Sequence, residues 1–286
     1  MTEPAVIVRH VDLQRERGVA AAMDDVMQRA YRPPGFRAQI DLFGDLQPDG
    51  IIVAEDGETI VGTGCCIAYA DAGFGWIGLI ATEPAYERRG IGRALTEEAA
   101  RTLAAHGCAS VLDASAAGAP LYSRMGFTDC GATRVLERGR GSTARPARVT
   151  VIDAAAIDDI VAYDREVFGG DRRRLLSRLV ERNPDRAAVA RSRGGRVIGY
   201  AVANNDLLGP VAADDGDTLT DLVAFAATLD HERPLRVLMP PESTHGATFA
   251  ELGFETTREL RHMRRDLDRL PGDTGRYASR VGLAFG

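Results

Sequence analysis

The sequence contains no lysine, because each of its 35 basic residues is an arginine. Acetylation of the protein's own lysine side chains is therefore excluded. The 41 acidic residues leave a net charge of −6. Nucleic-acid binding normally needs a basic surface that displaces counterions from phosphates, so we expect no nucleic-acid partner. The short arginine run 172–174 is interpreted as a solvated helix face.

Cysteines are few and long apolar runs are missing. Cys65 and Cys66 are neighbours that would point to opposite faces of a strand, and Cys108 and Cys130 are isolated. The five histidines show no metal-ligand spacing. No stretch of 18 apolar residues occurs, and the N-terminus lacks a basic segment followed by an apolar one. We expect reduced thiols, no metal, no membrane partner and a cytoplasmic location.

The length of 286 residues predicts two domains rather than one. The polar, glycine-containing stretch 138–146 is the best linker candidate. We therefore predict a first domain at 1–138, a linker at 139–147, a second domain at 148–270 and a tail at 271–286. Alternating residues in the tail suggest one added strand.

Hydrophobic spacing and turn residues predict an α/β protein. Three strands in close order read as an antiparallel meander, and a helix, a further strand, a short helix and a final strand pair follow. The predicted strands of the first half are 6–9, 50–55, 59–68, 75–82 and 110–114, and its helices are 19–30, 92–106 and 119–125. In the second half we predict helices at 155–168, 172–182 and 218–229, and strands at 187–191 and 196–203.

The two halves share a local repeat. In the first, Val111-Leu112-Asp113 leads to Tyr122 and then to a Gly-Phe pair at 126–127. In the second, Val237-Leu238-Met239 leads to Phe249 and then to a Gly-Phe pair at 253–254, with the same step from the aromatic residue to the glycine. A duplicated domain is the economical explanation.

A strand, a turn that begins with proline and a glycine-containing loop precede a helix in the first half. The first amides of a helix have no intrahelical partner, and the helix dipole adds positive potential there, so the loop suits a pyrophosphate. Gly90 and Gly92 let the backbone approach such a group, and Arg88, Arg89 and Arg93 add charge. Glycines alone are a weak signal, because many helices begin this way and bind nothing.

The context makes this stretch resemble the acetyl-CoA loop of the GNAT superfamily of N-acetyltransferases. Its pattern Arg/Gln-x-x-Gly-x-Gly/Ala is matched by Arg89, Gly92 and Ala94, and the later Leu-Tyr-x-x-x-Gly-Phe by residues 121–127. The resemblance covers about residues 5–138, and residues 148–265 through the repeat. It implies two tandem GNAT folds, each a mixed, mostly antiparallel sheet flanked by helices.

By this resemblance acetyl-CoA is the acyl donor. The strand before the loop would offer backbone groups to the pantetheine arm, and the loop and helix start would hold the pyrophosphate. The donor-binding residues so implied are Ile80, Ala81 and Thr82 of the strand and Arg88, Arg89, Gly90, Ile91, Gly92, Arg93 and Ala94 of the loop and helix.

Acetyl transfer to an amine also needs a base and an acid. An amine with a pKa near 10.4 must lose a proton at neutral pH, which costs about 4 to 5 kcal/mol. By the resemblance Asp113, at the end of a strand, is the first candidate for the base, with a capping or loop-fixing role equally open. Glu83 is the second, acting through water. Tyr122 matches the family's general acid, which protonates the leaving thiolate.

The second half lacks these groups. Where the phosphate loop would lie we align Leu208–Asp217, which carries three carboxylates and would repel a pyrophosphate. Phe249 replaces Tyr122, and Met239 replaces Asp113. We expect a degenerate copy that supports the fold and helps to close the acceptor pocket.

These features predict an N-acetyltransferase that moves an acetyl group to a primary amine, of a small molecule, by direct transfer in a ternary complex. Two other interpretations stay open: a non-catalytic acyl-CoA-binding sensor or partner module, and acetylation of a protein N-terminus or lysine. Residues 23–48, which would select the acceptor, carry no interpretable signature. A homodimer is left open.

Overall fold

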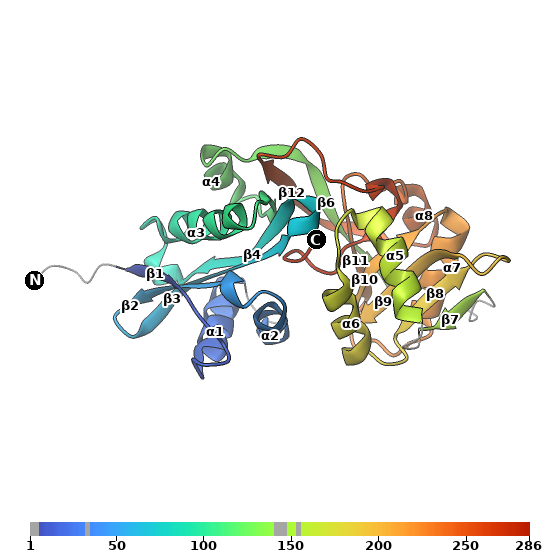
Figure 1. The fold of residues 1–286 in the computed structure, drawn as a ribbon, viewed down its shortest axis with the longest axis horizontal. Helices are drawn as coiled ribbons and strands as arrows, with labels where there is room; N and C mark the ends of the chain where they lie inside the picture. The colour runs from blue at the N-terminus through green and yellow to red at the C-terminus, as the bar shows by residue number, and fades with distance from the viewer. Residues whose placement is uncertain (1–5, 32–34, 140–147, 153–155) are drawn as a thin grey trace, which may run out of the picture. The chain divides into compact units, whose positions relative to one another are not determined.

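The computed structural model describes residues 6–31, 35–139, 148–152 and 156–286 (Figure 1). The chain divides into two compact units. Unit 1 consists of residues 1–112 with 264–267 and 285, and unit 2 consists of residues 113–263 with 268–284 and 286. This division follows contacts rather than the sequence repeat, and the predicted linker lies almost wholly outside the described residues. The domain boundaries therefore stay a prediction.

Unit 1 is built on neighbouring strands in the order β1-β2-β3-β4-β5. Strands β1 to β4 pair antiparallel, which confirms the predicted meander, and β5 pairs parallel to β4. The strands are β1 (Ile7–His10), β2 (Ile51–Asp56), β3 (Thr59–Tyr69), β4 (Phe74–Thr82) and β5 (Ala109–Ala114), whose last two residues count to unit 2.

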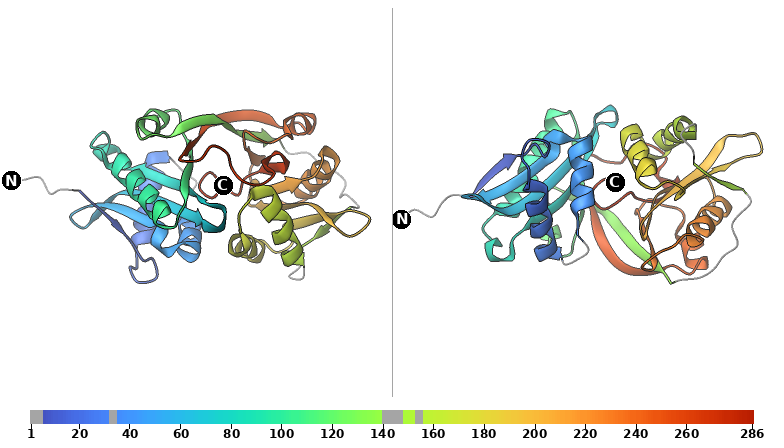
Figure 2. Two further views of the ribbon diagram at one scale, coloured as in Figure 1. Left: turned by 45° about the horizontal axis from the view of Figure 1, so that its top comes forward. Right: turned by 90° about the horizontal axis from the view of Figure 1, so that it is seen from below.

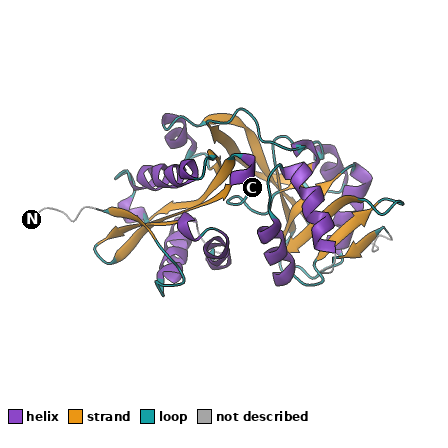
Figure 3. Ribbon diagram, in the orientation of Figure 1, coloured by secondary structure: helices purple, strands orange, loops and turns teal. Residues whose placement is uncertain are grey.

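Helices cover both faces of the unit 1 sheet. Helix α3 (Ile91–Ala105) lies on one face, and α1 (Val19–Tyr31) and α2 (Arg37–Leu46) lie on the other (Figures 1 and 3). Apolar residues at helical spacing drive this arrangement, since Leu95, Ala99 and Leu103 of α3 are completely buried. The sequence did not predict α2.

Unit 2 contains the remaining strands in the order β12-β6-β11-β10-β9-β8-β7, with β13 paired to β10, except that the last two residues of β12 count to unit 1. The strands are β6 (Thr128–Arg138), β7 (Val149–Val151), β8 (Ala187–Arg191), β9 (Val197–Asn204), β10 (Leu207–Ala213), β11 (Leu235–Met239), β12 (Glu255–Arg265) and β13 (Tyr277–Ser279). The helices are α4 (Ala119–Arg124), α5 (Ile157–Phe168), α6 (Arg173–Arg182), α7 (Gly216–Ala227) and α8 (Gly246–Glu251). Strand β13 is the predicted added strand, whereas a single β6 stands where we predicted a strand pair.

Two adjacent residues of β9 show how unit 2 is layered. A Cβ on Gly199 would meet Thr218 and Leu222 of α7, whereas the ring of Tyr200 contacts Tyr163 of α5. Because neighbouring strand residues point to opposite faces, α7 covers one face and α5 the other (Figure 2). Both halves of the sequence thus have strands flanked by helices, and the fold is mixed α/β with mostly antiparallel pairing.

One surface prediction is wrong. Arg172 is 2% exposed rather than solvated, and its guanidinium makes a paired contact with the carboxylate of Asp164 at 2.6 and 3.0 Å. It also donates to the hydroxyl of Tyr277 at 2.7 Å and lies over the ring of Phe168. A buried guanidinium needs such partners, and Asp164 supplies the opposite charge.

Candidate functional site

Strand β4 is irregular just before the predicted phosphate loop. Its register against β3 shifts, so that Cys65 lies opposite Gly78 but Thr63 lies opposite Ala81. Leu79, in the shifted segment, has a positive φ of 52°, which is unusual for a branched residue. Such bulges bend a strand and often occur beside functional sites.

The edge of β4 that pairs with β5 also loses its partner near this bulge. Its parallel pairing with β5 extends from Phe74 to Trp76 in the described register, and Ile80, Ala81 and Thr82 lie beyond it. An edge that leaves its neighbour exposes backbone groups that an extended ligand can use as a strand would. The hydroxyl of Tyr31 already donates to one of them, the carbonyl of Ile80, at 2.7 Å.

The loop after β4 ends in a glycine whose backbone only a glycine adopts readily. Gly90 is the N-cap of α3 and has a φ of +84°. Nothing lies within 4 Å of a Cβ built on it, so backbone conformation rather than space requires the glycine. Arg88 also has a positive φ, of 62°, and Arg88 and Arg89 are exposed.

The start of α3 has the electrostatics of an anion site. The amide of Ala94 makes the first helical hydrogen bond, to the carbonyl of Gly90 at 3.0 Å, so the amides of Ile91, Gly92 and Arg93 precede the ladder. The first turn contains no acidic residue, and Gly90 offers no side-chain cap. Positive potential therefore remains available to a phosphate.

Helix α3 packs closely against β3 and β4. A Cβ on Gly62 would lie 2.9 Å from Ile91 and 3.0 Å from Leu95, and one on Gly75 would lie 2.3 Å from Leu103. These two glycines let α3 lie against the sheet along its whole length. The predicted phosphate loop thus leads into a helix that packs closely on the sheet.

The last turn of α1 is tied to the end of β4. Arg29 forms a 2.5 Å ion pair with Glu83, the residue that follows the strand, and the carboxylate keeps 15% of its surface exposed. Together with the hydrogen bond from Tyr31 to Ile80, this pair places α1 beside the irregular segment. Neither Arg29 nor Tyr31 was selected from the sequence, because a partner on another element gives no local signal.

Asp113 lies in unit 2, in a closed network. Its carboxylate accepts a hydrogen bond from Thr133 at 2.6 Å, lies 3.2 Å from Nδ1 of His262 and is paired with Arg280. The side chains of Asp113 and His262 have no exposed surface, and that of Arg280 has 1%.

These partners determine the protonation states of Asp113 and His262. Although burial alone would raise it, the pKa of Asp113 is lowered to about 2, because Arg280 and the hydrogen bonds stabilise the carboxylate. Burial lowers the pKa of His262. A carboxylate that is enclosed, paired and weakly basic does not suit a general base, so these surroundings do not support the first candidate.

Tyr122 lies on the short helix α4 of unit 2. Its ring packs edge-on against Phe127 at 6.0 Å between centroids, and its carbonyl accepts from the amide of Phe127 at 3.1 Å. The side chain is half-buried. The matching pair in the second half, Phe249 and Phe254, packs in the same edge-on manner at 5.2 Å, which supports the repeat and shows where the hydroxyl is missing.

Comparisons with known proteins match both halves. A model of the acetyltransferase (GNAT) family matches residues 20–127, and a model of an acetyltransferase (GNAT) domain matches residues 160–277. The chain belongs to the GNAT acetyltransferases. It is a tandem N-acetyltransferase of that family, and hence an acyltransferase.

Relatives of this GNAT chain agree with the assignment. The uncharacterized N-acetyltransferase YitH of Bacillus subtilis (strain 168) is 29% identical over 194 residues, covering 64% of this chain and 67% of YitH. A putative acetyltransferase from Pyrococcus horikoshii is 23% identical, with a TM-score of 0.83 over 98% of this chain and 96% of that one. A GCN5-related N-acetyltransferase from Sphaerobacter thermophilus is 11% identical, with a TM-score of 0.67 over 93% and 96%. The last two likenesses show the fold.

In the second GNAT domain the start of α7 and the end of β10 have partners within the chain itself. Asp215 caps α7, and its carboxylate accepts from the amide of Thr218 at 2.7 Å. Strand β13 pairs with the last part of β10, with Val211 opposite Ser279 and Ala212 opposite Tyr277. The alignment of 208–217 with the phosphate loop needs a correction, because residues 207–213 form β10 and the loop is reduced to Asp214 and Asp215.

Within the described residues, no helix is both long and apolar enough to cross a membrane. In that same part of the chain, no three His, Cys, Asp or Glu residues gather in a way that could hold a metal ion. The absence of a metal stays a prediction.

Proposed function

We propose that this GNAT protein is an acetyl-CoA-dependent enzyme that acetylates a primary amine of a small molecule by direct transfer in a ternary complex. The observation that carries the proposal is the start of α3. There an uncapped helix N-terminus, a left-handed Gly90 and exposed arginines follow directly on the irregular segment of β4. Anions bind at helix starts of this kind.

The residues present fit acetyl-CoA. Backbone amides of Ile91, Gly92 and Arg93 would face the pyrophosphate, and no acidic side chain of the first turn opposes it. The backbone of Ile80–Thr82 would hold the pantetheine arm beside the bulge. When bound, acetyl-CoA supplies the thioester-linked acetyl group.

We assign the base to Glu83, directly or through water. Its carboxylate is partly exposed at the end of β4, in contrast to the enclosed Asp113. The ion pair with Arg29 fixes the carboxylate and leaves its second oxygen to accept a proton. A base in this position removes the proton that makes an alkylammonium acceptor unreactive.

We assign the acid to Tyr122. A phenol can protonate a departing thiolate and is uncharged at neutral pH. Its place in the Leu-Tyr-x-x-x-Gly-Phe pattern supports the role. A cationic amine as acceptor agrees with the chain's net charge of −6, since opposite charge favours encounter.

Calorimetric titration of acetyl-CoA tests the proposal. We expect one site per chain, lost in Gly90→Val, because a β-branched residue does not adopt the left-handed backbone of the loop. Gly107→Val is the matched control, since Gly107 also has a positive φ, of +72°, and open space around it but lies just beyond the other end of α3. Absence of binding to the wild type, or binding that survives Gly90→Val, would contradict the proposal.

A further inference from the structure

Three residues of unit 1 contact one another in turn at the proposed phosphate loop. Asp56 is the last residue of β2, Tyr86 ends the short 3-10 helix Pro84–Tyr86, and Arg89 follows in the loop. The hydroxyl of Tyr86 donates to Oδ2 of Asp56 at 2.8 Å. The guanidinium carbon of Arg89 lies 4.8 Å from the centroid of the Tyr86 ring.

Each contact restricts the next side chain. The bond to Asp56 fixes the direction of the Tyr86 ring, which is half-buried. The ring face then attracts the Arg89 guanidinium through a cation–π contact, although Arg89 is itself exposed. A long arginine that is free to rotate loses conformational entropy when it binds a ligand, and one that is already held loses less.

Asp56 also keeps the tyrosine in its donor form. The hydrogen bond to the carboxylate raises the pKa of Tyr86, so the phenol stays protonated throughout the neutral range.

We propose that Tyr86 is a positioning residue that holds Arg89 ready for the phosphates of acyl-CoA, with Asp56 fixing the ring. The inference rests on the proposed function. Neither Tyr86 nor Asp56 need touch the ligand, because both act through Arg89.

Binding of CoA alone, measured by calorimetry, tests the inference on the full chain. Tyr86→Leu removes the ring, and we expect the Kd for CoA to rise about two- to fivefold, the factor that an exposed cation–π contact is worth. Tyr86→Phe keeps the ring but loses the bond to Asp56, so its effect should be smaller. In steady-state assays KM for acetyl-CoA should rise while kcat is unchanged.

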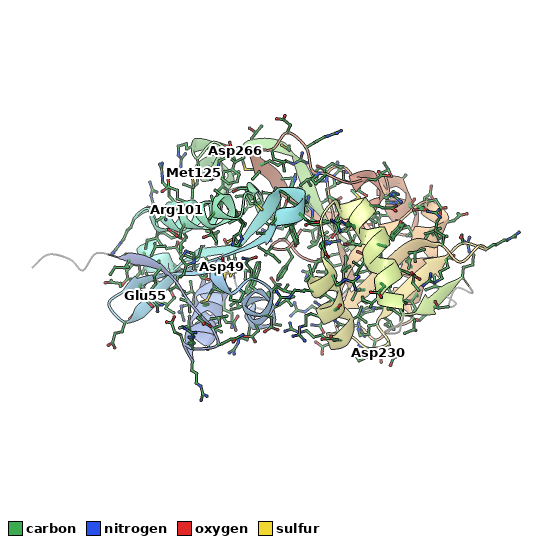
Figure 4. All side chains as sticks on the ribbon, in the orientation of Figure 1. Asp49, Glu55, Arg101, Met125, Asp230 and Asp266 are labelled. Atoms are coloured by element: carbon green, nitrogen blue, oxygen red, sulfur yellow. The ribbon has the colours of Figure 1, made fainter. Side chains whose placement is uncertain are left out.

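A purely structural role of Tyr86 would also raise the Kd for CoA. A double-mutant cycle therefore has to distinguish that role from the positioning role. If Tyr86 acts through Arg89, Tyr86→Leu should cost nothing further in an Arg89→Gln background. Arg101→Gln is the matched control, because Arg101 is an exposed arginine near the other end of α3 (labelled in Figure 4) and should leave the Kd unchanged. Unchanged melting temperatures would show that the variants are folded.

The outcomes are distinct. Non-additive effects of the two changes support the positioning role. If the wild type binds CoA and the two effects add, the inference fails while the donor site stands. If the wild type does not bind CoA, the proposed function fails and the inference falls with it.

Discussion

The clearest prediction separates a structural Asp113 from a catalytic one. Asp113→Asn keeps the shape of the side chain but takes the negative charge of Asp113 away from the buried Arg280 guanidinium. Removing one partner of a buried ion pair typically costs about 3 to 5 kcal/mol. His262 does not supply the missing negative charge, and its lowered pKa keeps it neutral near pH 7. We therefore expect a large loss of stability.

The pH dependence gives a second measure of the same interaction. The pKa of Asp113 is about 2 when folded and about 3.9 in an unfolded chain, so the native state favours the carboxylate by about 2 to 3 kcal/mol. Because the folded pKa is the lower one, this stabilisation is fully present above about pH 4 and is lost as the pH falls towards 2. The stability of Asp113→Asn should therefore lack this part of the decrease at low pH.

Urea unfolding followed by circular dichroism is the assay. Fluorescence of Trp76, the single tryptophan, reports the unfolding of unit 1, whereas circular dichroism reports the unfolding of the whole chain. The double variant Asp113→Asn with Arg280→Met should be more stable than Asp113→Asn, because no lone charge remains buried. A variant with an unchanged urea midpoint that is folded but inactive would refute this reasoning and restore Asp113 as the base.

Two further predictions concern the chemistry. Tyr122→Phe should lower kcat about 10²- to 10⁴-fold with little change in the Kd for acetyl-CoA. Steady-state kinetics and titration measure the two quantities, and turnover near that of the wild type would exclude Tyr122 as the acid. Glu83→Gln should lower kcat/KM for the amine, and an amine that is less basic should depend less on the residue. An unchanged kcat/KM for a strongly basic amine would contradict the assignment.

Much of unit 1 could be predicted because its signals are local. Turn residues mark the ends of β2, β3 and β4, and apolar residues at helical spacing mark α3. The strand, the loop and the helix start of the predicted phosphate loop likewise follow one another in the sequence. Helix α2 was missed, since its first residue follows a phenylalanine that offers no capping side chain.

The network around Asp113 could not be predicted in the same way. Its partners His262 and Arg280 lie 149 and 167 residues further along the chain. A carboxylate at the end of a strand looks the same in sequence whether it faces solvent or a buried guanidinium. The same holds for Arg172. Its neighbouring arginines suggested a solvated helix face, whereas the side chain is buried and bonds to Asp164 and Tyr277.

In the second domain a helix start and a strand edge have partners within the chain itself. A helix start and an open strand edge leave polar groups that need partners when no ligand is bound. Asp215 provides one for α7, and β13 pairs with the end of β10. A Cβ on Gly209 would lie 2.0 Å from the carbonyl of Arg280, so the returning segment fits against β10 only because that residue is glycine. We therefore predict that the residues that stabilise this domain also keep acetyl-CoA out of it, so that a second donor site would require replacing Asp215 and displacing β13 together.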